Sequence, residues 1–302
     1  MPNRDQIQDA RALLPEGPSG TSRRTVLQAA IASGLFAAAV QPVSAQTMIV
    51  TSSDGLKAGD VRIDVNGFAM PAYRAAPQGR QNLPVVLVLS EIFGVHAHIA
   101  DVARRLAHQG YLAIAPQLFV RQGDAASYTD IPTLMREVIA KVPDAQVLAD
   151  LDATVRWAGQ HGGDTSRLGV TGFCWGGRMT WLYAAHNPQV KAGVAWYGRL
   201  VGDKTALTPQ QPVDLAAQLK APVLGLYGEA DTGIPMETVE RMSDALKAAG
   251  EQGNAAARKS LIGVYKDAPH AFHADYRASY REQDARHGWK AMLDWFRQNG
   301  VR

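Results

Sequence analysis

The sequence predicts an α/β fold in which a mostly parallel, doubly wound sheet of about eight strands is flanked by helices. Beyond Gln46, short and almost wholly apolar runs alternate with stretches in which apolar residues recur every three or four positions. Continuous apolarity is typical of strands that are buried on both faces of a parallel sheet. The wider spacing is typical of helices with one buried face. Together the two patterns indicate strands joined by crossover helices.

The expected elements alternate along the chain. Residues 47–75 lack helical periodicity, so antiparallel strands are expected there, at one edge of the sheet. Parallel strands are expected at residues 84–90, 111–115, 168–172, 191–197, 222–227 and 260–265, and helices around residues 99–106, 148–158, 239–249 and 289–296. Ligands of such sheets bind beyond the carboxyl ends of the strands, so the residues that follow each strand are the candidates for a site.

Charge and cysteine content exclude several functional classes. The 302 residues include 31 Lys and Arg and 28 Asp and Glu, which gives a net charge of +3. The sequence contains no run of basic residues that would suit a nucleic-acid backbone. Cys174 is the only cysteine, which excludes an intramolecular disulfide and a cysteine-rich zinc or iron–sulfur site. We expect no nucleic-acid partner, no cofactor and no metal.

The first residues are typical of an export signal. A twin arginine at residues 23–24 precedes a weakly hydrophobic run at 26–40, and Val-Ser-Ala at 43–45 offers the small-x-small pattern that signal peptidase requires. The run is shorter than the ~20 residues of a spanning helix. We therefore expect a cleaved twin-arginine signal peptide at residues 1–45, handled by the twin-arginine translocation machinery, and no stable membrane anchor. Residues 46–302 would then form a single periplasmic domain.

Residues 172–177 read Gly-Phe-Cys-Trp-Gly-Gly between an apolar strand and an apolar helix. This is the nucleophile-elbow pattern Gly-x-Ser-x-Gly with Cys174 in the central place. Side chains at the flanking glycine positions would collide with so tight a turn. The N-terminus of the following helix favours a thiolate at Cys174 and offers the backbone N–H of Trp175 to an oxyanion. A lone cysteine is often mere packing, but the strand before it and the helix after it favour a nucleophile.

An elbow nucleophile requires an acid and then a histidine, each after a later strand. Asp231 follows the strand expected at residues 222–227, and His270 follows the one at 260–265. His270 would take the proton of the nucleophile and return it to the leaving group, while Asp231 orients the imidazole. Glu229 is a rival for the acid, and Asp231 would also suit an ordinary turn.

Glu91 ends the first long parallel strand, where an elbow enzyme places its second oxyanion amide. Negative charge there opposes both an oxyanion and a thiolate. From the residues alone, a solvated side chain at the end of a strand is the favoured interpretation.

The chain from Thr47 to Arg302 resembles the dienelactone hydrolases (carboxymethylenebutenolidases), a family of α/β-hydrolases with a Cys-Asp-His triad. The resemblance rests on residues 91–94, 110–111, 115–116, 172–177 and 269–272. It implies an α/β-hydrolase fold and a carboxylic ester hydrolase that opens an enol lactone, or cleaves a related small ester, through an acyl-enzyme.

The resemblance also implies roles for particular residues. Cys174 would be the nucleophile, His270 the base and Asp231 the residue that orients the base. Glu91 would hold the thiol in the resting enzyme and help to deprotonate it when substrate arrives. The second oxyanion amide, beside that of Trp175, would be the backbone N–H of Ile92.

One position departs from the family pattern. Relatives often carry a substrate-binding arginine four residues after the histidine, where this chain has Ala274. Recognition of a substrate carboxylate would then fall to another cation, and Arg121 and Arg199 are the candidates because they follow predicted strands. A different ester or lactone is accordingly an alternative substrate.

Three other functions are alternatives to a dienelactone hydrolase. His96, His98 and Asp101 approach the ligand run of metallohydrolases, with His273 as a further imidazole, but the aspartate is displaced by one position and the last histidine is missing. We interpret His96 and His98 as the start of a helix. A non-catalytic periplasmic binding protein would have no use for a strained elbow with a free thiol, so a broader carboxylesterase is the closer alternative.

The export signal predicts a simple experiment. Residues 1–46 fused to a fluorescent reporter should carry the folded reporter into the periplasm, and replacing both Arg23 and Arg24 by lysine should abolish export, because the receptor discriminates the arginine pair. Periplasmic fluorescence is the measurement. Equal export of the paired-lysine fusion would contradict the twin-arginine assignment.

Overall fold

The computed structural model describes residues 48–302, and within them eight strands form one sheet in the order β1-β2-β4-β3-β5-β6-β7-β8. The β1–β2 and β2–β4 pairs are antiparallel and the remaining pairs are parallel, which confirms the predicted architecture. The strands are β1 (Leu56–Val65), β2 (Phe68–Pro77), β3 (Leu83–Leu89), β4 (Leu112–Pro116), β5 (Gly163–Phe173), β6 (Val190–Trp196), β7 (Val223–Gly228) and β8 (Leu261–Tyr265). The export signal expected at residues 1–45 lies outside the described residues.

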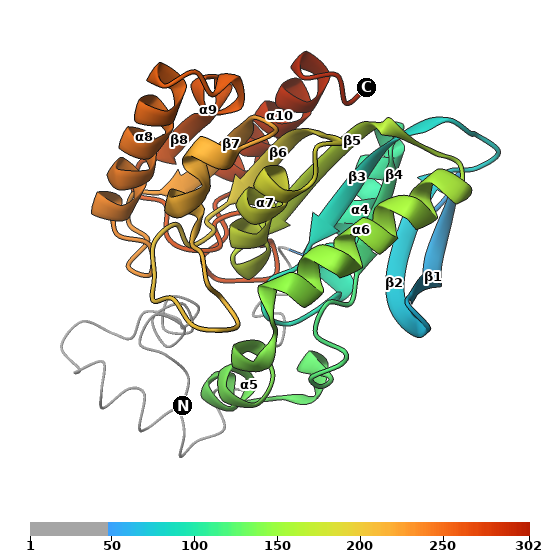
Figure 1. Ribbon diagram of the computed structural model, residues 1–302. Coiled ribbons are helices and arrows are strands. Elements are labelled where there is room, and N and C mark those ends of the chain that lie inside the picture. The colour runs from blue at the N-terminus through green and yellow to red at the C-terminus, as the bar shows by residue number, and fades with distance from the viewer. Residues whose placement is uncertain (1–47) are drawn as a thin grey trace.

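Helices cover both faces of the sheet. The helices are α4 (Ala97–His108), α5 (Ile131–Glu137), α6 (Asp144–Gln160), α7 (Trp175–His186), α8 (Met236–Glu251), α9 (Ala255–Lys259) and α10 (Glu282–Gln298), with short 3₁₀ segments η1 (Ala125–Ser127), η2 (Ile139–Lys141) and η3 (Pro212–Gln218). In Figure 1, α6 and α7 lie in front of the sheet, and α4 and α10 lie behind it. Right-handed crossovers place α4 and α7 on opposite faces of the sheet. The chain moves in one direction across the sheet from β3 to β4 and in the other direction from β5 to β6.

Two features of the strands differ from the prediction. β5 begins at Gly163, well before the predicted start at Leu168, because Gly163 and Asp164 already pair with β3 ahead of a shift in register. The expectation that every parallel strand is buried on both faces is wrong for β8. Leu261 and Val264 are 56% and 44% exposed, because β8 is the last strand of the sheet and one side of it has no neighbour.

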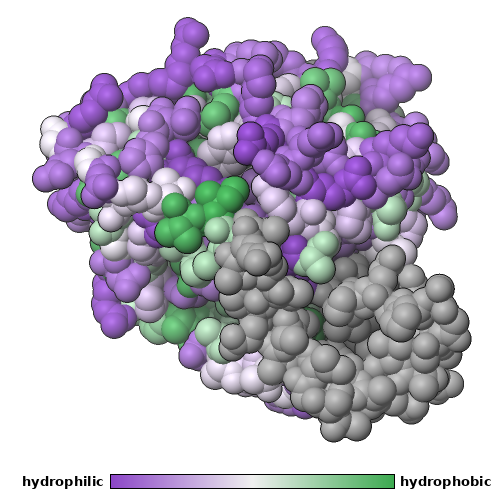
Figure 2. All heavy atoms as spheres, turned by 180° about the vertical axis from the view of Figure 1, so that it is seen from behind, coloured by the Kyte–Doolittle hydropathy of each residue, from purple (hydrophilic) through white to green (hydrophobic). Residues whose placement is uncertain are grey.

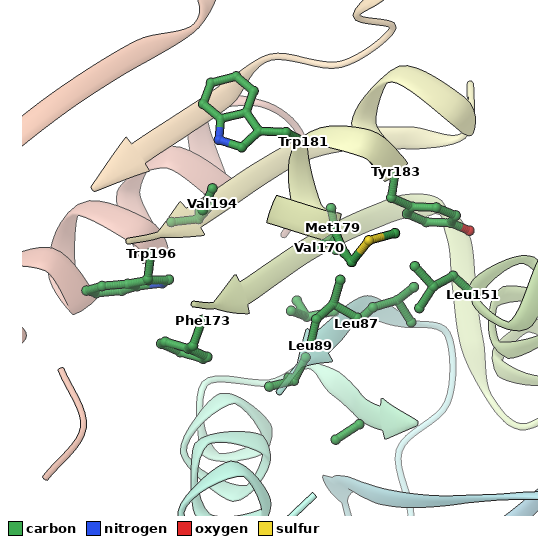
Figure 3. Packing of buried hydrophobic residues seen from close by; sticks show 14 of the residues in the cluster. Leu87, Leu89, Leu151, Val170, Phe173, Met179, Trp181, Tyr183, Val194 and Trp196 are labelled. Carbon is green, nitrogen blue, oxygen red and sulfur yellow. The ribbon is translucent and has the colours of Figure 1, made fainter. Parts of the chain in front are cut away.

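The core lies between the central strands and the helices. Figure 3 shows Leu87 of β3, Val170 of β5 and Met179 of α7 packed together, and all three are fully buried. Phe173 and Trp196 stack at 5.6 Å between ring centroids, next to the site described below. Among the residues that Figure 2 colours by hydropathy, most side chains on the face that it presents are hydrophilic. None of the helices between residues 48 and 302 is both long and apolar enough to span a bilayer.

The strand order places a site beyond the carboxyl ends of the parallel strands. The direction of winding reverses between β3 and β5, so the loops that leave their carboxyl ends diverge and leave space for a ligand. Glu91 and Cys174 follow these two strands, and Tyr197, Asp231 and His270 follow β6, β7 and β8.

Close packing of α10 on the sheet requires a glycine. A Cβ atom built on Gly288 would lie 2.6 Å from Cζ3 of Trp196. The indole cannot move aside easily, because it is fully buried and packs against Phe173 and His273. Gly159 on α6 faces a different environment, where the nearest atom to an added Cβ is 3.4 Å away.

These two helical glycines should respond in opposite ways to substitution by alanine. Helix propensity alone favours alanine by ~1 kcal/mol at both positions. Gly288→Ala should nevertheless lower the free energy of unfolding by about 2 kcal/mol because of the overlap with Trp196, whereas Gly159→Ala should leave it unchanged or raise it. Urea denaturation of both variants tests this. Equal stabilisation of the two would contradict the described packing of α10.

Candidate active site

Cys174 occupies a strained turn between β5 and α7. Its backbone angles are φ 53° and ψ −113°, in the left-handed region that residues with a side chain rarely adopt. Such strain costs about 1–3 kcal/mol and persists only where the surroundings enforce it. Here the N–H of Cys174 donates to the carbonyl oxygen of Trp196 at 3.0 Å, and the residue is 2% exposed.

The glycines on either side of Cys174 permit a close backbone approach, as the sequence predicted. A Cβ on Gly172 would lie 2.2 Å from the carbonyl oxygen of Gly176, and a Cβ on Gly176 would lie 2.3 Å from that of Leu89. The N–H of Gly176 also donates to the carbonyl oxygen of Ser90 at 3.1 Å. The elbow therefore lies against the end of β3, one residue before Glu91.

Trp175 and Ile92 belong to the two segments that meet at this contact. Trp175 is the first residue of α7, so its N–H has no acceptor within the helix. Ile92 directly follows Glu91 and is 1% exposed. These are the two amides that the sequence assigned to an oxyanion hole, and they belong to the two segments that meet at Gly176.

Asp231 and His270 are joined by a short hydrogen bond. Nδ1 of His270 lies 2.6 Å from Oδ2 of Asp231, and both side chains are almost fully buried. The other carboxylate oxygen of Asp231 accepts from the N–H groups of Gly233 and Ile234, so the residue shapes a turn as well as orienting the imidazole. The rival acid, Glu229, is exposed and accepts instead from the N–H of Asp267.

Nε2 of His270 is buried and has no hydrogen-bond partner among residues 48–302. The ring of Tyr197 lies 5.1 Å from the His270 ring, in an edge-on contact. Tyr197 also follows Trp196, whose carbonyl holds the elbow. Burial, with the charges of Glu91, Tyr276 and Cys174, raises the pKa of Tyr197 well above its usual value. Tyr197 thus connects the His270 side of the site with the Cys174 side. Sequence reasoning missed Tyr197, although its position directly after β6 marked it as a candidate for the site.

Glu91 is buried, at 1% exposure, so the expectation of a solvated residue at a strand end is wrong. Its Oε2 lies 3.2 Å from Nε2 of His96. Burial by itself would raise the pKa of Glu91, but the hydrogen bond with His96 and the positive charges of His96 and His98 outweigh burial and hold the pKa at about 2. The carboxyl is therefore ionised at neutral pH.

The two arginines proposed from the sequence occupy different surroundings. Arg121 forms two hydrogen bonds with Asp150, at 2.6 and 2.8 Å, and its guanidinium lies over the ring of Phe68. Burial lowers the pKa of Arg199 to about 10, against the opposing charges of Asp203 and Asp231. Arg199 is therefore the one of the two that lies within electrostatic reach of Asp231.

Sequence reasoning missed a third arginine. Arg277 is 7% exposed, and its guanidinium lies 5.6 Å from the centre of the Phe93 ring and 5.7 Å from that of Tyr276. Its positive charge lowers the pKa of Tyr197 and of Tyr276, whereas electrostatic interaction with Cys174 raises the pKa of both. Arg277 lies in the irregular segment between β8 and α10, where no periodicity or motif marks it.

The histidines considered as metal ligands do not form a metal site within the described part of the chain. His96 precedes α4, as expected, and its ring stacks on that of His98. Nδ1 of His98 lies 3.1 Å from Asp275, and burial lowers the pKa of His273 well below its usual value. No group of three His, Cys, Asp or Glu side chains between residues 48 and 302 is arranged to hold a metal ion.

Comparison with known proteins identifies the family of this chain. The family model described as "Dienelactone hydrolase family" matches residues 70–300. The chain belongs to the dienelactone hydrolase family. A "Putative carboxymethylenebutenolidase" of Methylorubrum extorquens is 59% identical to this family member over 281 residues, which cover 93% of this chain and 94% of that protein.

Two further proteins that are similar to this chain are informative. A "Probable 2-oxo-3-(5-oxofuran-2-ylidene)propanoate lactonase" of a Bradyrhizobium species is 32% identical over 242 residues, covering 78% of this chain and 92% of that protein. The crystal structure of a "Putative Dienelactone Hydrolase" from Klebsiella pneumoniae is 59% identical and superposes with a TM-score of 0.77, covering 80% of this chain and 99% of that one. This dienelactone hydrolase family member is therefore a hydrolase with the α/β-hydrolase fold.

Proposed function

We propose that the protein opens an enol lactone or cleaves a related small carboxylic ester, with Cys174 as nucleophile, His270 as base and Asp231 as the residue that orients the base. The observation that carries the proposal is the buried His270. Its Nδ1 is fixed by Asp231 while its Nε2 has no partner among the described residues. A fixed imidazole with an unpartnered Nε2 suits proton transfer in nucleophilic catalysis. Cys174 lies on a strained elbow after β5, and His270 lies on the segment after β8, so both follow the carboxyl ends of parallel strands.

The proposed reaction has two halves. Cys174 Sγ attacks the carbonyl carbon as its proton passes to Nε2 of His270, and the N–H groups of Ile92 and Trp175 stabilise the oxyanion. Collapse of this intermediate breaks the bond to the ring oxygen, which receives the proton from His270. Water, deprotonated by His270, then attacks the thioester, and the thiol leaves with that proton. The product is a carboxylate, and Cys174 is regenerated.

The place of action is also a proposal. The twin arginine and the small-x-small pattern within residues 1–45 favour export through the twin-arginine machinery, which would place the enzyme in the periplasm. A folded protein with a reactive thiol suits a route that carries already folded proteins.

The triad predicts strongly non-additive losses of activity. Cys174→Ala and His270→Ala should each lower kcat/KM for a p-nitrophenyl ester by about three orders of magnitude or more, with little further loss in the double variant, because triad members act as a unit. Asp231→Asn should cost less than either. Glu229→Gln is the control and should retain full activity. Folded Cys174→Ala protein with parental activity would contradict the proposal, and absence of hydrolysis in the parent would favour a binding protein.

We further propose that Arg277 recognises a carboxylate on the substrate. A guanidinium is suited to carboxylates, and this one lies against Phe93, in the segment that contributes Ile92. The lactone named for the Bradyrhizobium relative is a propanoate and so bears a carboxylate. Arg121 and Arg199 remain the alternatives, although the guanidinium of Arg121 already makes two hydrogen bonds to Asp150.

Matched substrates distinguish the three arginines. Arg277→Gln should raise KM for the p-nitrophenyl monoester of glutaric acid about tenfold, since a charge-assisted hydrogen bond contributes ~1.5 kcal/mol or more. It should leave KM for neutral p-nitrophenyl valerate nearly unchanged. Arg121→Gln should alter neither value. If Arg199→Gln alone changes the ratio of the two KM values, Arg199 is the recognition residue and the assignment of Arg277 is wrong.

A further inference from the structure

The proposed reaction leaves His96 without a role, although His96 touches the buried carboxylate of the site. Nε2 of His96 lies 3.2 Å from Oε2 of Glu91. Glu91 is 1% exposed, whereas His96 is 23% exposed. Oε1 of Glu91 has no hydrogen-bond partner in the described part of the chain. His96 thus lies between the buried carboxylate and solvent.

Aromatic rings hold the imidazole of His96 in this orientation. It stacks on His98, with 6.1 Å between centroids and 20° between planes. The edge-on ring of Tyr276 lies 5.0 Å away, and Phe93 makes a similar contact at 6.3 Å. Phe93 and His98 belong to the same stretch of chain as His96, and Tyr276 comes from the segment between β8 and α10. Turning Nε2 of His96 away from Glu91 would disturb these ring contacts.

The second imidazole, His98, is engaged with other groups. Its Nδ1 lies 3.1 Å from Oδ1 of Asp275. The other oxygen of Asp275 accepts from Arg105, which also pairs with Asp101. The side chain in direct contact with Glu91 is therefore His96.

His96 has access to protons from solvent. It borders a hollow of ≈ 320 Å³ at the edge of the sheet. The polar residues that line this hollow together with His96 are Asp60 on β1, Tyr73 on β2 and Gln117 after β4.

The geometry points to His96 as a positioning residue that holds Glu91 and offsets its negative charge, so that the thiol of Cys174 can ionise near neutral pH. Loss of the proton from His96 would leave the carboxylate uncompensated beside the elbow. Like-charge repulsion would then disfavour the thiolate. The inference rests on the proposed role of Cys174 as a nucleophile.

The experiment measures the alkylation rate of Cys174 by iodoacetamide against pH in the full-length protein. His96→Gln retains a hydrogen-bond donor but cannot carry charge. It should move the midpoint of thiol ionisation about one pH unit upward and slow alkylation at pH 7 about tenfold. Glu91→Gln should move the midpoint downward. In the Glu91→Gln background, the effect of His96→Gln should shrink at least threefold, because the charge that His96 offsets is gone.

His108→Ala is the matched control, since His108 lies on the same helix but is exposed and contacts Ser52. It should leave the profile unchanged. An unchanged profile in His96→Gln, or an equal shift with and without Glu91, would overturn the inference. Because the readout is alkylation, these outcomes are separate from the test of catalysis, in which an active Cys174→Ala variant would contradict the proposed function itself.

Discussion

The site depends on a close backbone contact that only glycine allows. Gly176 rests against the carbonyl groups of Leu89 and Ser90, and Gly172 rests against Gly176. This contact forces Cys174 into a left-handed conformation and brings the end of β3 next to the elbow. The strain of about 1–3 kcal/mol is small beside the packing that surrounds the turn. The same contact places the segment that carries Glu91 beside the turn that carries Cys174.

That placement creates an electrostatic problem. A carboxylate that is buried next to a thiol requires compensation, because an unpaired buried charge costs several kcal/mol. Pairing with His96 provides it, and the neighbouring His98 contacts Asp275, which pairs in turn with Arg105. Removing one member would leave its neighbour uncompensated, so these side chains are expected to respond to substitution as a coupled group rather than singly.

Some parts of the site were predictable because they depend on local pattern and chain order. The run from β5 through the glycines into α7 marked Cys174, and the residues after β7 and β8 marked Asp231 and His270. Glu91 was identified as a candidate, but its burial and its contact with His96 were not predicted, because the sequence does not show which residues cover the end of a strand. Arg277 and Tyr276 were missed because the segment between β8 and α10 has no regular structure and hence no periodicity to read.

The sequence by itself determined the alternation of strands and helices, the antiparallel edge and the order of Cys174, Asp231 and His270 along the chain, each after a strand. Each of these follows from periodicity or from short motifs, which act over a few residues. Only the tertiary structure decided that β8 is an exposed edge, that Asp231 rather than Glu229 reaches His270, and that His96 meets Glu91. These outcomes depend on which segments the sheet order brings together, and distant segments meet through packing that no local pattern encodes.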